Sequence, residues 1–218
     1  MKIFLDNRTV EFVPARPENP MNSDLIVESA VPEELRIAWD DFCRYERFRK
    51  LLIIDPGFQE AEESEVFRTF MTFFKFVPAA GGLVKNENGA FLFIHRLGYW
   101  DLPKGKIEKS DIAGPGHTLH DPDTARKAAV REVKEETGLK SVVVIKSLPS
   151  TWHIYFAKEK YCLKKTQWFE MESHSGQALK PATSEGIFLV KWTPPENIHC
   201  ILSHTYGSIR ELLLEIVF

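Results

Sequence analysis

The sequence predicts a mixed α/β (α+β) protein, because strand-like and helix-like segments follow one another along its 218 residues. Two short stretches carry this prediction. Residues 128–139 (AAVREVKEETGL) have a helical pattern that ends at a glycine, and Asn86-Glu87-Asn88-Gly89 between two apolar runs predicts a β-hairpin turn. The first seventy residues contain segments of both kinds, so we expect a small N-terminal module ahead of a second domain.

The N-terminal α+β module is predicted to span residues 1–71. The expected strands cover residues 2–5, 9–13, 23–27 and 51–54, and the first two are expected to form a small hairpin through Asp6-Asn7-Arg8. The expected helices cover residues 32–50 and 60–70. The aromatic residues of these helices recur at helical spacing and are interpreted as core. No motif indicates the role of this module, which could cover an active site, dimerise or pack on a sheet.

The second domain is predicted to span residues 72–218. Its expected strands cover residues 74–77, 81–85, 90–95, 141–146, 151–157, 165–171 and 187–192, and residues 203–217 are expected to form a closing amphipathic helix. Between these strands lies one long helix. Asp121 is its expected N-cap, Pro122 its first residue and Gly138 its C′ residue.

Composition excludes several classes of protein. The net charge of −3 gives no general attraction to nucleic acid or to an anionic membrane, so neither partner is expected. No run of eighteen apolar residues is present, and the N-terminus lacks the apolar stretch of a signal peptide. Three widely spaced cysteines favour reduced thiols, so we expect a cytoplasmic protein.

Three glutamates share one side of the predicted long helix. Glu132, Glu135 and Glu136 fall within an arc of roughly 100°, where like charges repel one another. Such a stripe suits a bound cation, and hard ions such as Mg²⁺ prefer oxygen ligands. The alternative is a solvated acidic face with an Arg131–Glu135 pair at i,i+4.

The residues around this helix carry a resemblance to a known family. A loop with the sequence WDLPKGKIE precedes the helix by about twenty residues and contains Gly105, and residues 131–139 read REVKEETGL. Together they resemble the Nudix box of the Nudix hydrolase superfamily, which here spans residues 105–139. The second half of the box matches the family pattern at every fixed position.

The first half of the box departs from the family pattern. An insertion of about twelve residues, approximately residues 111–122, separates Gly105 from the acid that the family places seven residues before Arg131. Counting back from Arg131 gives Asp123, whereas counting forward from Gly105 gives Asp111. Both remain candidates, and the spacing to Arg131 favours Asp123. The two histidines of the insertion, His117 and His120, are expected to be ordinary loop residues.

The resemblance implies a fold, a reaction and a metal site. The implied fold is an α/β/α sandwich with a mixed sheet, and the implied reaction is water attack on a nucleoside diphosphate linked to another moiety. Glu132 and Glu136 are the expected main ligands of Mg²⁺ or Mn²⁺. Glu135 is expected to be a ligand, the base or both, and the Lys104 carbonyl a further ligand. Arg131 is expected to anchor the helix to the loop.

Other residues are expected to complete the site. Glu185, beside a glycine ahead of a strand, resembles the outer acid of the family. The expected substrate-binding residues are Arg96, Trp100, Lys106 and Lys165. Lys160 and Lys164 join Lys165 beside Tyr161 and Trp168, a group that could contact phosphate and stack a base or could form a solvated edge.

The entry loop is loosely similar to those of dinucleoside polyphosphate and diphosphoinositol polyphosphate hydrolases. A dinucleoside polyphosphate is therefore the first substrate expected. The alternative is a Nudix-fold regulatory protein that senses a nucleotide without turnover and uses residues 1–71 for output or for homodimerisation. RNA decapping would require a basic track that the sequence does not contain.

Overall fold

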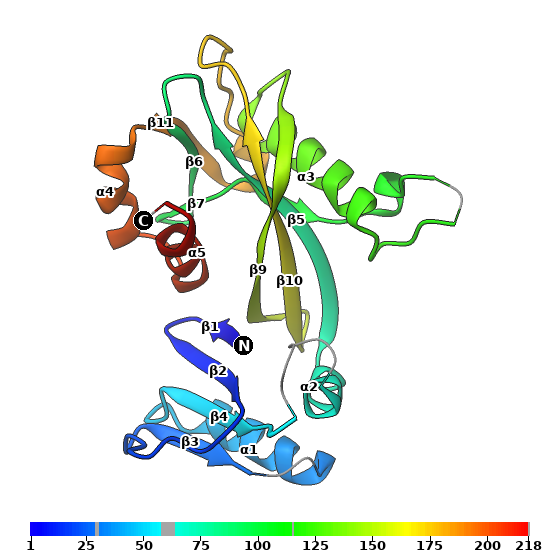
Figure 1. Cartoon of the computed structure of the whole chain (residues 1–218), viewed down its shortest axis with the longest axis vertical. Coiled ribbons are helices and arrows are strands. Elements are labelled where there is room, and N and C mark those ends of the chain that lie inside the picture. The colour runs from blue at the N-terminus through cyan, green and yellow to red at the C-terminus, as the bar shows by residue number, and fades with distance from the viewer. Residues whose placement is uncertain (29–30, 58–63, 115, 218) are drawn as a thin grey trace. The chain divides into compact units, whose positions relative to one another are not determined.

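The computed structural model of the protein describes residues 1–28, 31–57, 64–114 and 116–217 (Figure 1). These residues form two compact units. The first contains Met1–Phe76 and Trp152–Lys164, and the second contains Val77–Thr151 and Lys165–Phe218. Three long strands contribute residues to both units: β5 (Lys75–Lys85), β9 (Val143–Ala157) and β10 (Lys160–Glu172).

The first unit combines a small sheet with two helices. Its strands follow the order β9-β1-β2-β4-β3, with β1 at Lys2–Leu5, β2 at Arg8–Val13, β3 at Asp24–Val27 and β4 at Lys50–Ile54. The β1–β2 pair is the predicted antiparallel hairpin, whereas β4 runs parallel to both β2 and β3. The helices are α1 (Pro32–Arg44) and α2 (Glu65–Met71). Helices and strands are both present, and the sheet contains parallel and antiparallel pairs, so the predicted α/β fold class with a mixed sheet is confirmed.

The core of the first unit is largely aromatic. Trp39 and Phe42 of α1 and Phe67 and Phe70 of α2 are each at most 1% exposed. They pack with Phe12 of β2, and the rings of Phe12 and Phe67 meet edge to face at 5.4 Å. The aromatic residues of the two helices are therefore core, as predicted. The β9–β10 hairpin adds three more buried side chains, Trp152, Ile154 and Leu163.

The second unit has a sheet in the order β11-β6-β5-β10-β9, with β6 at Phe91–Arg96 and β11 at Ile187–Thr193. Two short strands branch from it: β7 (Tyr99–Asp101) pairs with β6, and β8 (Lys104–Lys106) pairs with β5. The helices are α3 (Pro122–Thr137), α4 (Ile198–Ser203) and α5 (Gly207–Val217). Single 3₁₀ turns occur at Lys109–Asp111, Thr183–Glu185 and Pro195–Asn197.

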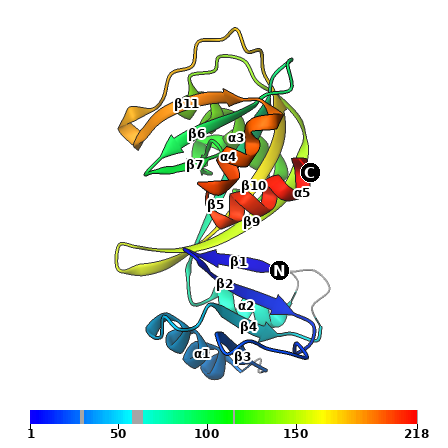
Figure 2. The ribbon, with the colours of Figure 1, turned by 90° about the vertical axis from the view of Figure 1, so that its left-hand side faces the viewer.

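Helices cover both faces of this sheet. Because successive strand residues point to opposite faces, Leu92 and Ile94 of β6 pack with α3, whereas Phe91 and Phe93 pack with α4 and α5. Figures 1 and 2 show α3 on one side of these strands and α4 and α5 on the other. The three layers agree with the sandwich that the sequence resemblance implied.

The long helix α3 begins and ends where the sequence predicted. Asp121 is its N-cap, Pro122 is its first residue, and Gly138 ends it in the left-handed conformation with φ 80°. The Asp121 side chain, however, accepts a hydrogen bond from the Thr118 amide rather than from the helix. The Asp121 side chain therefore stabilises the last turn of the insertion and not the first turn of α3.

Three predicted helices have different bounds. The helix predicted for residues 32–50 ends at Arg44, because Lys50 pairs with both Thr9 and Asp24 as the first residue of β4. The helix predicted for residues 60–70 begins at Glu65 among the described residues, and residues 60–63 lie outside them. The closing helix predicted for residues 203–217 begins only at Gly207, and α4 precedes it.

Several predicted strands are longer than expected. The segments 74–77 and 81–85 form the single strand β5, and the segments 141–146 and 151–157 form the single strand β9. Pro149 is tolerated in β9 because it lies outside the stretch that pairs with β1, at Trp152 and His153. The short strands β7 and β8 were not predicted, since three residues are too few for a periodic pattern.

Candidate active site

The loop that precedes α3 approaches the helix very closely at Gly105. Gly105 lies in β8, opposite Ala80 of β5, and a Cβ atom added to it would lie 2.1 Å from Cδ of Glu132. No side chain larger than hydrogen fits there. The glycine therefore lets a carboxylate of the helix rest directly on the backbone of the loop.

The three glutamates of α3 differ in exposure. Glu132 and Glu136 are 7% and 1% exposed, whereas the side chain of Glu135 is 52% exposed. Burial raises the pKa of Glu132; Arg131 opposes this rise, and the negative charges of Glu135 and Glu185 add to it. Burial also raises the pKa of Glu136, to about 7, against the opposing effect of Lys104. The site thus combines two buried acids, Glu132 and Glu136, with one acid, Glu135, that is open to water.

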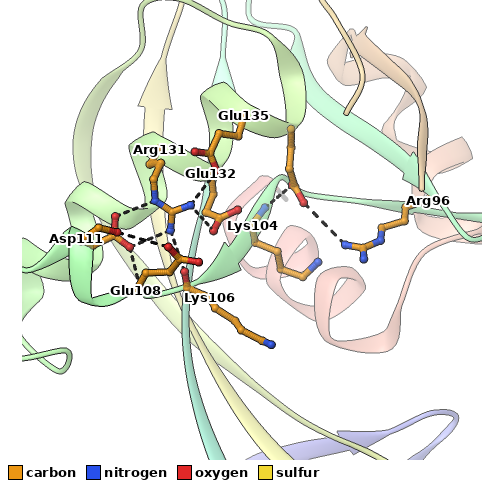
Figure 3. Close-up of polar contacts among 10 residues, drawn as sticks. Arg96, Lys104, Lys106, Glu108, Asp111, Arg131, Glu132 and Glu135 are labelled. Atoms are coloured by element: carbon orange, nitrogen blue, oxygen red, sulfur yellow. Dashed lines mark hydrogen bonds and ion pairs between the residues drawn. The ribbon is translucent and has the colours of Figure 1, made fainter. Parts of the chain in front are cut away.

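Arg131 joins the helix to the loop (Figure 3). Its Nε and Nη2 atoms each donate to one oxygen of Asp111 at 2.8 Å, and Nη2 also donates to the Lys106 carbonyl at 3.0 Å. Its Nη1 atom lies 2.8 Å from Glu132 Oε1 and 2.8 Å from Glu135 Oε2. The fork geometry of the guanidinium allows this set of charge-assisted contacts.

The acid that faces Arg131 is Asp111, so the preference for Asp123 is corrected. Asp111 is 1% exposed and also accepts a hydrogen bond from the Glu108 amide at 2.8 Å. Burial alone would raise the pKa of Asp111, but the hydrogen bonds from Arg131 and Glu108 hold it below its usual value. Asp123 is exposed in the first turn of α3. Eight residues of helix place it about 12 Å along the axis from Arg131, which is beyond pairing distance.

A second group of charges surrounds Glu136. Its Oε2 atom accepts a hydrogen bond from the Lys104 amide at 2.8 Å, and its Oε1 atom lies 3.9 Å from Nη1 of Arg96. The Lys104 ammonium is paired with Asp101, which is 3% exposed. Sequence analysis missed Asp101, although an acid between Trp100 and Leu102 in a short apolar stretch was a usable signal.

Glu185 lies within electrostatic range of these acids. It is exposed at the end of a 3₁₀ turn, ahead of Gly186 with φ 75°, and its charge contributes to the raised pKa of Glu132. The segment that leads to Glu185 adjoins the end of α3, since the Ala182 amide donates to the Glu136 carbonyl at 3.3 Å. The role of Glu185 as the outer acid stays a prediction.

The remaining predicted substrate contacts are dispersed. The side chain of Lys106 is exposed, and Lys165 is half-buried on β10. Trp100 is half-buried, and its ring lies 5.0 Å from that of His95.

The predicted stacking group of the basic strand is corrected. Trp168 is 1% exposed and its Nε1 atom donates to Thr151 at 2.8 Å, so its ring is core and is unavailable to a base. Tyr161 belongs to the first unit, where its ring meets that of Trp39 at 5.2 Å.

The donor atoms on α3 suit a hard divalent cation, since all are carboxylate oxygens in an acidic setting. Within the described ranges, no three His, Cys, Asp or Glu side chains converge in positions that hold a metal. The reason is local: Arg131 engages Glu132 and Glu135, and the Lys104 amide engages Glu136. A cation that binds Glu132 and Glu135 would have to displace Arg131 from them.

Comparison with known families identifies the chain. A sequence model of the NUDIX domain matches residues 75–212, which is more than half of the chain. The protein therefore belongs to the Nudix family, as the sequence resemblance indicated, and is a hydrolase acting on phosphoanhydride-type substrates. None of the helices in the described ranges is long and apolar enough to cross a membrane.

Solved structures of similar fold come from several organisms. They include a C. elegans Ap4A hydrolase in a binary complex, with 22% identity, 64% of this chain and 93% of that chain covered, and a TM-score of 0.44. A MutT protein from Methanosarcina mazei Go1 has 21% identity, 65% and 93% coverage, and a TM-score of 0.45. The NUDIX domain of Shewanella oneidensis NrtR, complexed with ADP ribose, has 16% identity, 67% and 92% coverage, and a TM-score of 0.45.

Proposed function

We propose that the protein is a divalent-metal-dependent pyrophosphohydrolase that cleaves a nucleoside diphosphate linked to another moiety, with a dinucleoside polyphosphate as the first candidate. One observation carries this proposal: two buried glutamates and one exposed glutamate of α3 lie beside a loop whose glycine touches Glu132. Arg131, Arg96 and the Lys104 amide offset part of this concentration of negative charge, and a bound divalent cation would offset it further.

The roles of the residues follow from their exposure. Glu132, Glu135, Glu136 and the Lys104 carbonyl would hold Mg²⁺ or Mn²⁺, which would neutralise phosphate oxygens and lower the pKa of a bound water. Glu135 is the most exposed of the three acids, so it is best placed to accept the proton of the attacking water. Arg96 and the Lys104 ammonium supply positive charge beside Glu136 for the phosphate chain. Glu185 is the additional acid of the site.

A panel of dinucleoside polyphosphates, nucleoside triphosphates, nucleotide sugars and inositol pyrophosphates tests the proposal. With Mg²⁺ or Mn²⁺, at least one of these compounds should release phosphate or nucleotide. Glu135→Gln should reduce kcat by about 10²–10⁴-fold, the range that general base catalysis supplies. Asp123→Asn, an exposed acid on the same helix, is the matched control and should retain activity.

Chelator should abolish turnover and added Mg²⁺ should restore it. Turnover that persists in chelator, or in Glu135→Gln at the wild-type rate, would contradict the proposal. Tight nucleotide binding without turnover across the panel would favour the sensing protein instead.

We also propose that the protein works in a reducing compartment such as the cytoplasm. Cys43, Cys162 and Cys200 are all free thiols, which supports this placement. Recovery of the protein from an oxidising compartment by cell fractionation would contradict it. Homodimerisation stays a prediction, to be checked by sedimentation.

A further inference from the structure

Two tyrosines lie together at the edge of the active site. Tyr99 belongs to β7, and Tyr206 lies in the loop between α4 and α5. Their ring centroids are 5.0 Å apart with an interplanar angle of 32°, and the residues are 48% and 37% exposed. Sequence analysis singled out neither residue, since they are far apart in the chain.

Backbone contacts fix the loop of Tyr206 beside β7. The Trp100 amide donates to the His204 carbonyl at 2.9 Å, and Thr205 Oγ1 donates to the Trp100 carbonyl at 2.7 Å. Trp100 and Thr205 form a parallel bridge, which sets Tyr206 next to Asp101. These contacts already join the loop to the strand, so the tyrosine pair is not required for that purpose.

The tyrosine pair lies on the side of β7 that holds the charged groups of the site. Arg96 is the register partner of Tyr99, and residues directly opposite each other in a sheet point to the same face. Arg96 in turn approaches Glu136. Burial raises the pKa of Tyr206, and the charges of Asp101, Lys104 and Arg96 also act on its hydroxyl. The pair is therefore close to the groups that we assign to the phosphate chain.

The turn between β6 and β7 contains an unfavourable residue. Leu97 has φ 51° and Gly98 has φ 84°, so both residues of this two-residue turn are in the left-handed region. Asn-Gly is the favoured sequence for such a turn, and leucine is unfavourable in it. Leu97 is 69% exposed, so core packing does not explain its presence. An exposed apolar side chain in a strained conformation at this place points to a ligand.

We propose that Leu97, Tyr99 and Tyr206 form a platform that binds the nucleobase of the substrate, while Arg96 and Lys104 bind its phosphates. The inference rests on the proposed function and names the substrate class more closely. A planar base stacks on an aromatic face and gains from apolar neighbours. An inorganic or inositol polyphosphate has no such ring, so the platform favours nucleotides over those compounds.

Binding of AMP and of ribose 5-phosphate, measured by calorimetry with Mg²⁺ present, tests the platform without turnover. The two probes share the sugar and the phosphate, and only AMP has a base. Wild-type protein should bind AMP at least tenfold more tightly, as one stacked base commonly provides. Tyr206→Leu should remove most of that difference and leave ribose 5-phosphate binding unchanged, and Tyr206→Phe should retain it.

A second variant separates binding from folding. Leu97→Asn creates an Asn-Gly turn, so it should raise the melting temperature while it weakens AMP binding severalfold. Equal affinity of wild type for the two probes, or undiminished AMP affinity in both Tyr206→Leu and Leu97→Asn, would overturn the platform. Loss of ribose 5-phosphate binding in Tyr206→Leu to the same degree as AMP would also overturn it.

The binding assay and the hydrolysis panel can fail separately. If AMP binding depends on Tyr206 but no compound of the panel is hydrolysed, the platform stands and the pyrophosphohydrolase proposal falls. If the panel shows turnover only of compounds without a base, the platform and the nucleoside substrate both fall, and only metal-dependent phosphoanhydride hydrolysis stands.

Discussion

Arg131 determines much of the local geometry of the site. A single guanidinium contacts Asp111, Glu132, Glu135 and the Lys106 carbonyl, so it connects the loop, the 3₁₀ turn and the helix. Nε and Nη2 of Arg131 bind Asp111, whereas Nη1 contacts the two helix acids Glu132 and Glu135. The contact of Arg131 with Asp111 and its contacts with Glu132 and Glu135 are therefore separate parts of one network.

Replacing Asp111 tests which acid supports Arg131. Asp111→Asn should lower the free energy of unfolding at pH 7 by about 2 kcal/mol, because a buried charge-assisted pair loses its carboxylate. Asp123→Asn, at an exposed position, should change it by less than about 0.5 kcal/mol. Chemical denaturation followed by circular dichroism measures both. A larger effect for Asp123→Asn would return the role to that residue.

The effect of Asp111 should also depend on pH. Its pKa in the folded protein lies below the usual 3.8, so the folded state favours the charged form. The stabilisation is present above the unfolded pKa and is lost as pH falls through the lower, folded pKa. The difference in unfolding free energy between wild type and Asp111→Asn should therefore be steady from about pH 5 to 7 and shrink below about pH 4. A difference that grows in acid would contradict this assignment.

Gly105 allows the close approach of loop and helix. Gly105→Ala would place a methyl group 2.1 Å from the Glu132 carboxyl carbon, so either the loop or the carboxylate must move. We expect a loss of stability of about 2 kcal/mol and a large loss of hydrolysis. Gly114→Ala is the control, because a Cβ there meets nothing within 4 Å. Unchanged melting temperature and activity in Gly105→Ala would show that the site tolerates rearrangement.

At the scale of elements, the position of α3 depends on the contacts at its C-terminal end as well as on its buried face. Gly138 takes φ 80° and passes close to Lys180, whose amide donates to the Thr137 carbonyl at 2.8 Å. The end of the helix is thus joined to the segment that leads to Glu185. The hydrogen bond between Lys180 and Thr137 therefore links the segment of Glu185 to the helix that carries Glu132, Glu135 and Glu136.

Alanine substitutions at Gly138 and Gly186 distinguish the cost of backbone strain from the cost of steric crowding, because the two glycines have similar φ angles and different surroundings. Gly138→Ala combines an unfavourable φ with a Cβ 2.7 Å from the backbone nitrogen of Lys180, so it should cost about 3 kcal/mol. Gly186→Ala has φ 75° but meets nothing within 4 Å, and should cost only about 1 kcal/mol. Equal losses in the two variants, measured by denaturant unfolding, would mean that Lys180 moves aside freely.

At the scale of the whole molecule, the first unit is not an independent N-terminal segment. Its core includes Trp152, Ile154 and Leu163 from the β9–β10 hairpin, which are at most 6% exposed. These residues follow α3 in the sequence. The two units therefore share strands, and a cut near residue 71 would divide one hydrophobic core.

A shortened chain that begins at Val77 tests this point. Removal of the preceding residues uncovers Trp152, Ile154 and Leu163, so we expect aggregation and binding of a hydrophobic dye. The same shortened chain with Trp152→Ser, Ile154→Thr and Leu163→Ser should bind less dye. A monomeric shortened chain that ignores the dye and melts cooperatively would refute the shared core.

The sequence predicted the parts of the fold that depend on local patterns. The bounds of α3 follow from Asp121, Pro122 and Gly138, and the β1–β2 hairpin follows from a short polar turn between apolar runs. The prediction that the helix α1 continues from residue 44 to residue 50 was wrong. Lys50 pairs with strands that are distant in sequence, and no local pattern indicates that pairing. The sequence analysis predicted two strands where the structure has the single strand β9, on either side of Pro149. The sequence alone does not show which edge of a strand is hydrogen-bonded, and this decides where a proline is tolerated.

The sequence by itself determined the family, the box helix and the three glutamates on one side of it, because helical periodicity and end signals are encoded within a few turns. Only the tertiary structure decided that Asp111 faces Arg131, that Trp168 is core, and that Tyr99 and Tyr206 meet. Each of these depends on the path of an insertion or on contacts between distant segments. Such contacts are selected by packing and hydrogen bonding of the whole unit, and no local pattern specifies them.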